Sequence, residues 1–188
     1  QRGGGRGEGG RGGPAETEMG PVIKEARGKK VQEYTGIGKT DEARLVHGGE
    51  FAGTEGWVYR PTIFADGRKD MRMAQEEIFG PSTLVMPVSG LEEALEVANS
   101  TQYGLSMSIY TNDLRKAFHA MDEMQSGIVY VNAPTIGAEI QLPFGGVKNT
   151  GNGHREAGTV ALDEFTEWKT IYVDYSGRLQ RAQIDTGE

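Results

Sequence analysis

The sequence contains no cysteine at any of its 188 positions. This absence excludes disulfide bonds, zinc sites built on thiolates and a cysteine nucleophile within the chain. The three histidines, His47, His119 and His154, show no i, i+4 spacing and have no cysteine neighbours to complete a ligand set. We therefore predict that the chain binds no metal.

The sequence also lacks a long hydrophobic run. No stretch approaches about 18 consecutive apolar residues, and no apolar signal segment opens the chain. We predict a cytoplasmic protein that neither spans nor binds a membrane. The net charge of −7 makes the surface repel phosphate backbones, which argues against a nucleic-acid partner.

Composition divides the chain into a body and two tails. The first thirteen residues hold eight glycines, three arginines and no apolar residue, so they cannot bury a core. We predict a disordered Gly/Arg-rich tail over residues 1–18, one folded domain over residues 19–175 and a flexible tail over residues 176–188. An Arg-Gly tract can bind RNA weakly, but three arginines on an acidic body favour a plain tail.

Strand-like and helix-like patterns alternate through the body. The first expected helix covers about 22–35, and Gly36 and Gly38 should end it. Two further helices are indicated by apolar stripes at helical spacing, one from Leu91 to Ala98 and one from Leu114 to Met121, which should stop at Gly127. The expected strands are the apolar runs at 43–49, 56–64, 82–88, 105–110 and 127–132. This alternation predicts an α/β fold with a mainly parallel βαβαβ sheet and helices on both faces.

Two later segments complete the predicted architecture. Residues 132–158 form a long Gly- and Pro-rich loop after the third strand of the βαβαβ unit, where open α/β sheets bind ligands. Ser89 and Glu92 have the spacing of a capping box, and Thr111 and Asn112 are candidate caps of the following helix. A short helix then leads into a last strand near residues 169–175, which we expect at the edge of the sheet.

The motif QEEIFGP, residues 75–81, is the strongest candidate for a site. Taken alone, Glu76 and Glu77 fit a general acid/base pair, an acceptor for ribose hydroxyls or a solvated turn. Phe79, followed by Gly80 and Pro81, favours a ligand, because an aromatic ring held by a tight bend can face a planar group. A neighbouring carboxylate would accept hydrogen bonds from hydroxyl groups.

Five ordered motifs together resemble the carboxyl-terminal part of NAD(P)-dependent aldehyde dehydrogenases. They are QEEIFGP, YGLSMSIYTND, SGIVYVN, LPFGGVKNTGNG and FTEWKT, and the resemblance runs from about residue 19 to residue 174. It implies that Glu77 accepts hydrogen bonds from the nicotinamide ribose and that Phe79 packs near the nicotinamide ring. It also implies that Asn132 and Phe144 lie on the substrate side, although a packing or turn role is an equal alternative for both.

The same resemblance shows which groups the chain does not contain. In that family a cysteine thiolate attacks the aldehyde and a glutamate activates water, and both groups precede the matched region. The resemblance therefore implies a truncated aldehyde dehydrogenase without its catalytic cysteine, general base and dinucleotide-binding domain. We expect the parent enzyme to be a homo-oligomer that oxidises a small aldehyde with NAD or NADP, and this chain alone to be inactive. The alternative is a non-catalytic module that docks with full-length homologues through its last strand.

Overall fold

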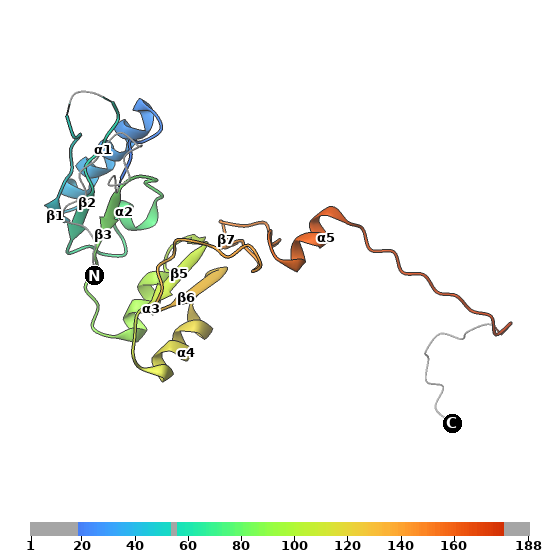
Figure 1. The fold of residues 1–188 in the computed structure, drawn as a ribbon. Coiled ribbons are helices and arrows are strands. Elements are labelled where there is room, and N and C mark those ends of the chain that lie inside the picture. Colours follow the sequence, from blue (N-terminus) through green and yellow to red (C-terminus); the bar gives the residue numbers. More distant parts are fainter. Residues whose placement is uncertain (1–18, 54–55, 179–188) are drawn as a thin grey trace.

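The computed structural model describes residues 19–53 and 56–178, so the predicted tail 1–18 and residues 179–188 lie outside it. The helices are α1 (Glu25–Thr40), α2 (Arg72–Gln75), α3 (Leu91–Asn99), α4 (Leu114–Glu123), the 3-10 turn η1 (Thr159–Ala161) and α5 (Leu162–Phe165). The strands are β1 (Arg44–His47), β2 (Thr62–Ala65), β3 (Ser82–Leu84), β4 (Tyr103–Gly104), β5 (Ser106–Ile109), β6 (Ile128–Val131) and β7 (Val147–Lys148). Helices and parallel strand pairs confirm the α/β class (Figure 1).

The first lobe consists of α1, α2 and a sheet in the order β1-β2-β3 (Figure 1). β1 runs antiparallel to β2, whereas β2 and β3 are parallel and pair Thr62 with Ser82 and Phe64 with Leu84. Phe64 is completely buried and forms a core with residues from both helices, including Tyr34 and Met73. This core fixes the position of the chain between α2 and β3, which carries the QEEIFGP motif.

Helix α1 is longer than the sequence pattern predicts, because it continues through Gly36 and Gly38 to Thr40. The prediction that these glycines end the helix is wrong. Gly38 is buried, and a Cβ added there would collide with Met73 Sδ and touch the Phe64 ring. The glycine is therefore a close-packing residue within the helix, and tertiary contacts outweigh its low helix propensity.

The second lobe consists of α3, α4, β5 and β6 (Figure 1). β5 and β6 are parallel, in register from Ser106 with Ile128 to Ile109 with Val131, and α4 connects them as a crossover helix. The caps differ in detail from those expected. Asp113 caps α4, with its Oδ1 accepting from Arg115 N, and Glu93 rather than Glu92 accepts from Ser89 N and Oγ before α3.

The strands of the predicted βαβαβ unit divide between two sheets. β3 pairs with β2 in the first lobe, whereas β5 and β6 form a separate pair in the second. Residues 19–53 and 56–178 therefore contain two parallel pairs, each with its own crossover helix, α2 or α4. Hydropathy patterns indicate which segments are extended. Every strand offers the same backbone N–H and C=O groups, however, so the pattern could not predict which strand pairs with β3.

From α5 onward the chain extends away from both lobes (Figure 1). We call residues 162–178 the arm. It begins with α5, which agrees with the short helix expected there, but residues 167–175 form no strand. The expected edge strand is thus absent from the described residues, because a strand needs a hydrogen-bonded neighbour and this segment has none among them.

The described residues also bear on the predicted environment of the chain. Across residues 19–53 and 56–178, none of the helices combines the length and the apolar character needed to cross a bilayer. The same residues contain no group of three or more His, Asp or Glu side chains arranged to hold a metal ion. A cytoplasmic location stays a prediction.

Candidate functional site

The loop of residues 76–81 connects α2 to β3 and lies at the amino end of the parallel pair β2–β3. Glu76 N donates to Arg72 O at 2.9 Å, and Thr62 N donates to Pro81 O at 2.8 Å. We expected ligand-binding residues beyond the carboxyl ends of the parallel strands. That rule fails for this loop, because a segment that directly precedes a strand meets its amino end.

Glu76 anchors one end of the loop through its side chain. Arg72 donates Nε–H to Glu76 Oε1 and Nη2–H to Oε2, each at 2.9 Å, and the Tyr34 hydroxyl also donates to Oε2. Hydrogen bonds from Arg72 and then from Tyr34 lower the pKa of Glu76 to about 2. Glu76 is therefore a carboxylate at neutral pH with both oxygens occupied, which is inconsistent with an acid/base pair made of Glu76 and Glu77.

Glu77 and Phe79 are directed to the surface of the same loop. The Glu77 side chain is exposed, and its main-chain oxygen accepts from Lys30 Nζ at 2.8 Å. Phe79 is 66% exposed, and the Arg27 guanidinium lies 4.9 Å from the centroid of its ring. The loop thus carries an exposed carboxylate and an exposed aromatic ring two residues apart.

The backbone at Phe79 explains why the ring stays exposed. Phe79 has φ 55°, a left-handed conformation that costs a bulky residue about 1–3 kcal/mol and persists only where the surroundings enforce it. The next residue, Gly80, packs so closely on Val31 of α1 that a Cβ there would collide with Val31 Cγ2. Pro81 then fixes the entry into β3. The strained turn rotates Phe79 away from the core.

Asn132 follows β6 and also has a left-handed backbone, with φ 56°. Its Oδ1 accepts from Thr111 N at 2.8 Å, and its Nδ2 donates to Thr111 O at 3.0 Å. The amide therefore ties the carboxyl ends of β5 and β6 together. This contact supports the turn role of Asn132 that the sequence left open, and it leaves one N–H of the amide for a ligand.

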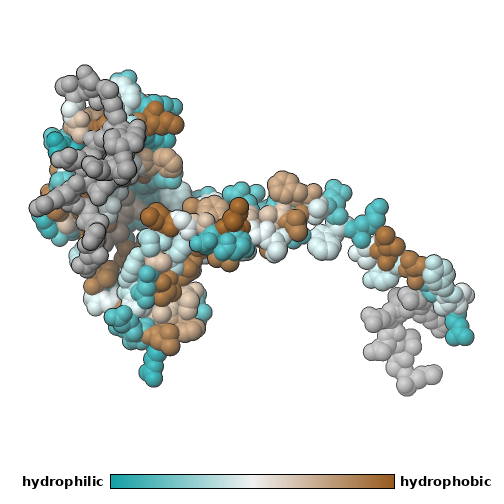
Figure 2. Space-filling view, in the orientation of Figure 1, coloured by the Kyte–Doolittle hydropathy of each residue, from teal (hydrophilic) through white to brown (hydrophobic). Residues whose placement is uncertain are grey.

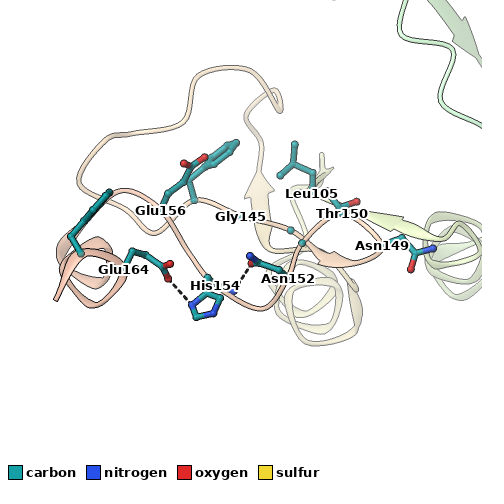
Figure 3. A pocket seen from close by; sticks show the side chains of 12 residues that line it. Leu105, Gly145, Asn149, Thr150, Asn152, His154, Glu156 and Glu164 are labelled. Atoms are coloured by element: carbon teal, nitrogen blue, oxygen red, sulfur yellow. Dashed lines mark hydrogen bonds and ion pairs between the residues drawn. The ribbon is translucent and has the colours of Figure 1, made fainter. Parts of the chain in front are cut away.

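Phe144 lies on the wall of a surface hollow of about 710 Å³, shown in Figure 3. Its main chain exchanges two hydrogen bonds with Glu156, at 2.6 and 2.8 Å. The hollow is lined by Leu105, which precedes β5, by Glu164 of α5 and by residues of the segment after β6, among them Phe144, Asn149, His154 and Glu156. Phe144 thus contributes apolar surface to this hollow.

Sequence reasoning missed an imidazole–carboxylate pair in this hollow. His154 Nδ1 lies 2.6 Å from Glu164 Oε1, and Figure 3 shows the two side chains facing each other across the hollow's rim. A carboxylate at Nδ1 leaves Nε2 as the acceptor of the neutral ring. No spacing pattern in the sequence signals this pair, because the turn through Gly158 and η1 brings the two residues together.

The four predicted residues occupy two separate places in the fold. Glu77 and Phe79 share one loop of the first lobe, whereas Asn132 and Phe144 belong to the second lobe and the loop after it. Within the described ranges, no hydrogen bond or ion pair joins the loop 76–81 to Asn132 or Phe144. The structure thus groups the residues expected at the cofactor apart from those expected at the substrate.

Comparisons with known proteins identify the family. The model of the aldehyde dehydrogenase family matches residues 8–171. A betaine aldehyde dehydrogenase of Sinorhizobium fredii is 40% identical over 160 residues, which cover 84% of this chain and 32% of the relative. An alpha-ketoglutarate semialdehyde dehydrogenase of Haloferax volcanii is 43% identical over 163 residues, which cover 84% of this chain and 34% of the relative.

Solved structures agree with the sequence relatives. The NAD+ complex of an aldehyde dehydrogenase from Bacillus cereus superposes with a TM-score of 0.85 at 36% identity, covering 89% of this chain and 34% of that structure. The chain spans about one third of the length of the relatives it matches. The chain belongs to the aldehyde dehydrogenase family.

Proposed function

We propose that this chain forms the carboxyl-terminal part of the catalytic domain of an enzyme that oxidises an aldehyde to a carboxylic acid with NAD or NADP. The observation that carries the proposal is the loop 76–81, which presents Glu77 beside a Phe79 ring held outward by a left-handed backbone. The Bacillus cereus relative, solved with NAD+, supports the choice of cofactor. An exposed carboxylate and an open ring fit a ribose and a nicotinamide.

Each predicted residue has a distinct role in this proposal. Glu77 accepts hydrogen bonds from the ribose hydroxyls next to the nicotinamide, and Phe79 packs near the nicotinamide ring and limits its tilt. Asn132 and Phe144 border the substrate side, Asn132 through its remaining N–H and Phe144 through apolar contact. The nicotinamide cofactor, when bound, supplies the hydride acceptor.

The chain by itself does not complete the reaction in this proposal, because it contains no cysteine. A thiolate is the nucleophile that adds to the aldehyde and later leaves as the thioester hydrolyses. A serine or threonine cannot replace it, since its hydroxyl has a much higher pKa and is a poorer leaving group. Purified chain mixed with NAD or NADP and a panel of aldehydes should therefore show no cofactor reduction at any pH, and measurable turnover would contradict this.

A hybrid enzyme tests the cofactor role directly. Residues 19–174 would replace the matching segment of the Bacillus cereus aldehyde dehydrogenase, which supplies the rest of the enzyme. Loss of a hydrogen-bonded carboxylate costs about 1.5–3 kcal/mol, so Glu77→Gln should raise the KM for NAD by at least tenfold. Glu33→Gln, which changes an exposed carboxylate on α1, is the matched control and should leave the KM unchanged. Equal KM values for both variants would refute the role of Glu77.

A second candidate function, docking with full-length homologues, is favoured by the arm. Ile171, Tyr172 and Val173 are 72%, 91% and 64% exposed, and their segment pairs with no strand among the described residues. An exposed extended segment can add to the edge of another sheet. The chain should then co-elute with a full-length relative in size-exclusion chromatography, and Ile171→Asp with Val173→Asp should abolish co-elution. Separate elution of the unmodified chain would exclude docking.

A further inference from the structure

One face of α1 contacts four of the six residues of the loop 76–81. The contacts are made at the spacing i, i+3, i+4 and i+7, which places the four helix residues on the same side of an α-helix. They join Arg27 to Phe79, Lys30 to Glu77, Val31 to Gly80 and Tyr34 to Glu76. The loop therefore lies against one side of the helix, which contacts it at four points.

The four contacts differ in chemistry and so restrain different parts of the loop. Lys30 Nζ holds the main chain at Glu77 O, at 2.8 Å, and leaves the Glu77 carboxylate uninvolved. Val31 is completely buried and sets how closely Gly80 approaches the helix. Arg27 lies over the ring of Phe79, 4.9 Å from its centroid, and so covers one of the two ring faces.

The Arg72–Glu76 pair restrains the start of the loop. The two hydrogen bonds from Arg72 Nε and Nη2 form a fork–fork pair, which fixes orientation better than a single contact. The Tyr34 hydroxyl donates to the same carboxylate from α1, and Tyr34 is only 6% exposed. Glu76 is thereby attached to α1 and α2 at once.

We propose that this face of α1, with the Arg72–Glu76 pair, is a positioning platform that fixes Glu77 and Phe79 for the cofactor. Arg27, Lys30, Tyr34, Arg72 and Glu76 are then positioning residues that act through their neighbours. The inference rests on the proposed cofactor role of Glu77 and Phe79. It assigns the adjacent glutamates opposite tasks, with Glu76 facing the protein and Glu77 facing the ligand.

The platform has a physical purpose. A loop that is already ordered pays little conformational entropy when a ligand binds, whereas a mobile loop must be ordered at that moment. Ordering is needed here because the left-handed backbone of Phe79 is unfavourable on its own. With Arg27 on one face of Phe79, only the opposite face is left for a planar ligand.

Nuclear magnetic resonance of the full chain tests the platform without any cofactor. Backbone order parameters for residues 77–80 should be near 0.85 in the unmodified chain and fall below about 0.6 in Arg72→Ala. Arg44→Ala is the matched control, because it removes another exposed guanidinium–carboxylate pair, Arg44 with Asp66, at 2.7 Å. In that variant the order parameters of the loop should not change.

A fluorine label reports the ring of Phe79 specifically. With 4-fluorophenylalanine incorporated and the signal assigned through Phe79→Leu, the resonance of position 79 should shift in Arg27→Gln and stay fixed in Arg44→Gln. A structural defect would broaden or shift several resonances, so a shift confined to position 79 is the signature of lost ring contact. An unchanged resonance at position 79 in Arg27→Gln would overturn the proposed contact.

The outcomes separate this inference from the proposed function. A loop that is mobile in the unmodified chain, or equally rigid in Arg72→Ala, overturns the platform whatever the hybrid enzyme does. If Arg72→Ala loosens the loop but Glu77→Gln leaves the KM of the hybrid for NAD unchanged, the platform stands and the cofactor role fails. If Arg72→Ala loosens the loop and Glu77→Gln raises the KM of the hybrid for NAD, then Arg72→Ala in the hybrid should also raise the KM for NAD, with little change in the KM for aldehyde.

Discussion

The first lobe and the arm both contain large aromatic residues, but the lobe buries those in its core, whereas the arm exposes its own. Phe64 of the lobe is completely buried and Tyr59 is 1% exposed, whereas Phe165 and Tyr175 of the arm are 87% and 94% exposed. Figure 2 shows apolar residues distributed along the arm without a covering layer. The same residue types therefore form a core in one region and a bare surface in the other.

The difference teaches that the candidate cofactor loop depends on contacts within the chain. The platform on α1, the buried Phe64 and the loop 76–81 all belong to the first lobe and restrain one another. The arm has no such internal support among the described residues, and exposed apolar patches of this kind mark interaction surfaces. The loop should thus be sensitive to mutations in the lobe and indifferent to mutations in the arm.

Truncating the matched phenylalanines should give the largest contrast. Phe64→Ala should lower the free energy of unfolding by about 3–5 kcal/mol, because it leaves a cavity in a packed core. Phe165→Ala removes the same atoms from an exposed position and should change the free energy of unfolding by less than about 0.5 kcal/mol. Urea denaturation followed by circular dichroism measures both. Similar losses for the two variants would mean that the arm is packed in solution.

Two of the three glycines of α1, Gly36 and Gly38, should respond in opposite directions to alanine. Gly38→Ala should destabilise the lobe by about 1–3 kcal/mol, because the new methyl group collides with Met73 Sδ. Gly36 has open space around it, so Gly36→Ala should stabilise the helix by up to about 1 kcal/mol through higher helix propensity. Thermal unfolding of the Gly36→Ala and Gly38→Ala variants measures both effects. Stabilisation by both substitutions would show that α1 packs less closely than described.

Acid should release the loop from the platform in a defined pH range. The pKa of Glu76 is about 2 in the folded chain, below the ordinary value near 4.3, so its carboxylate stabilises the fold above about pH 4.3. This contribution is lost as the pH falls through 2, when Glu76 takes up a proton and no longer pairs with Arg72. The fluorine resonance at Phe79 reports the folded chain, so it should stay constant from pH 7 to about 4 and move as the pH approaches 2.

Glu76→Gln provides the control for this acid transition. A neutral amide has no proton to gain in this range, so the variant should lack the step at low pH while retaining steps from other carboxylates. A step in the unmodified chain centred between pH 6 and 7 would contradict the assignment to Glu76, because a carboxylate paired with arginine does not titrate there.

Charges in the arm should produce the smallest effect on stability. Ile171→Asp with Val173→Asp should change the free energy of unfolding by less than about 0.5 kcal/mol, because both side chains are exposed. The same variant should bind less of an apolar fluorescent dye, since it removes exposed hydrophobic surface. Dye binding and urea titration on one sample test both statements. A large loss of stability would place these residues in contact with a lobe.

The sequence alone predicted the family motifs and most of the regular elements. Leu91, Ala94 and Leu95 repeat at helical spacing and form α3, and the apolar run before Asn132 forms β6. These predictions succeeded because periodicity reflects which side of an element is buried. The ends of elements were harder. Asp113 rather than Thr111 or Asn112 caps α4, since several neighbouring residues can accept the same N–H groups.

The candidate site was predicted in its residues but not in its arrangement. The sequence indicated Glu77 and Phe79, yet not that Glu76 would be paired with Arg72 and Tyr34. Arg72 lies within a short helix, but Tyr34 comes from α1, far away along the chain. The pairing of His154 with Glu164 was equally hidden, because it depends on a turn and not on a spacing.

The sequence by itself determined the family, the α/β class and the absence of a cysteine nucleophile, because these follow from residue identities and local patterns. Tertiary structure decided which strands pair, which glutamate faces the protein and how the Phe79 ring is exposed. The physical reason is that strand partners, ion pairs and strained turns are selected by contacts between distant segments. Such contacts form only when α1, α2 and β3 pack together, and no local pattern encodes them.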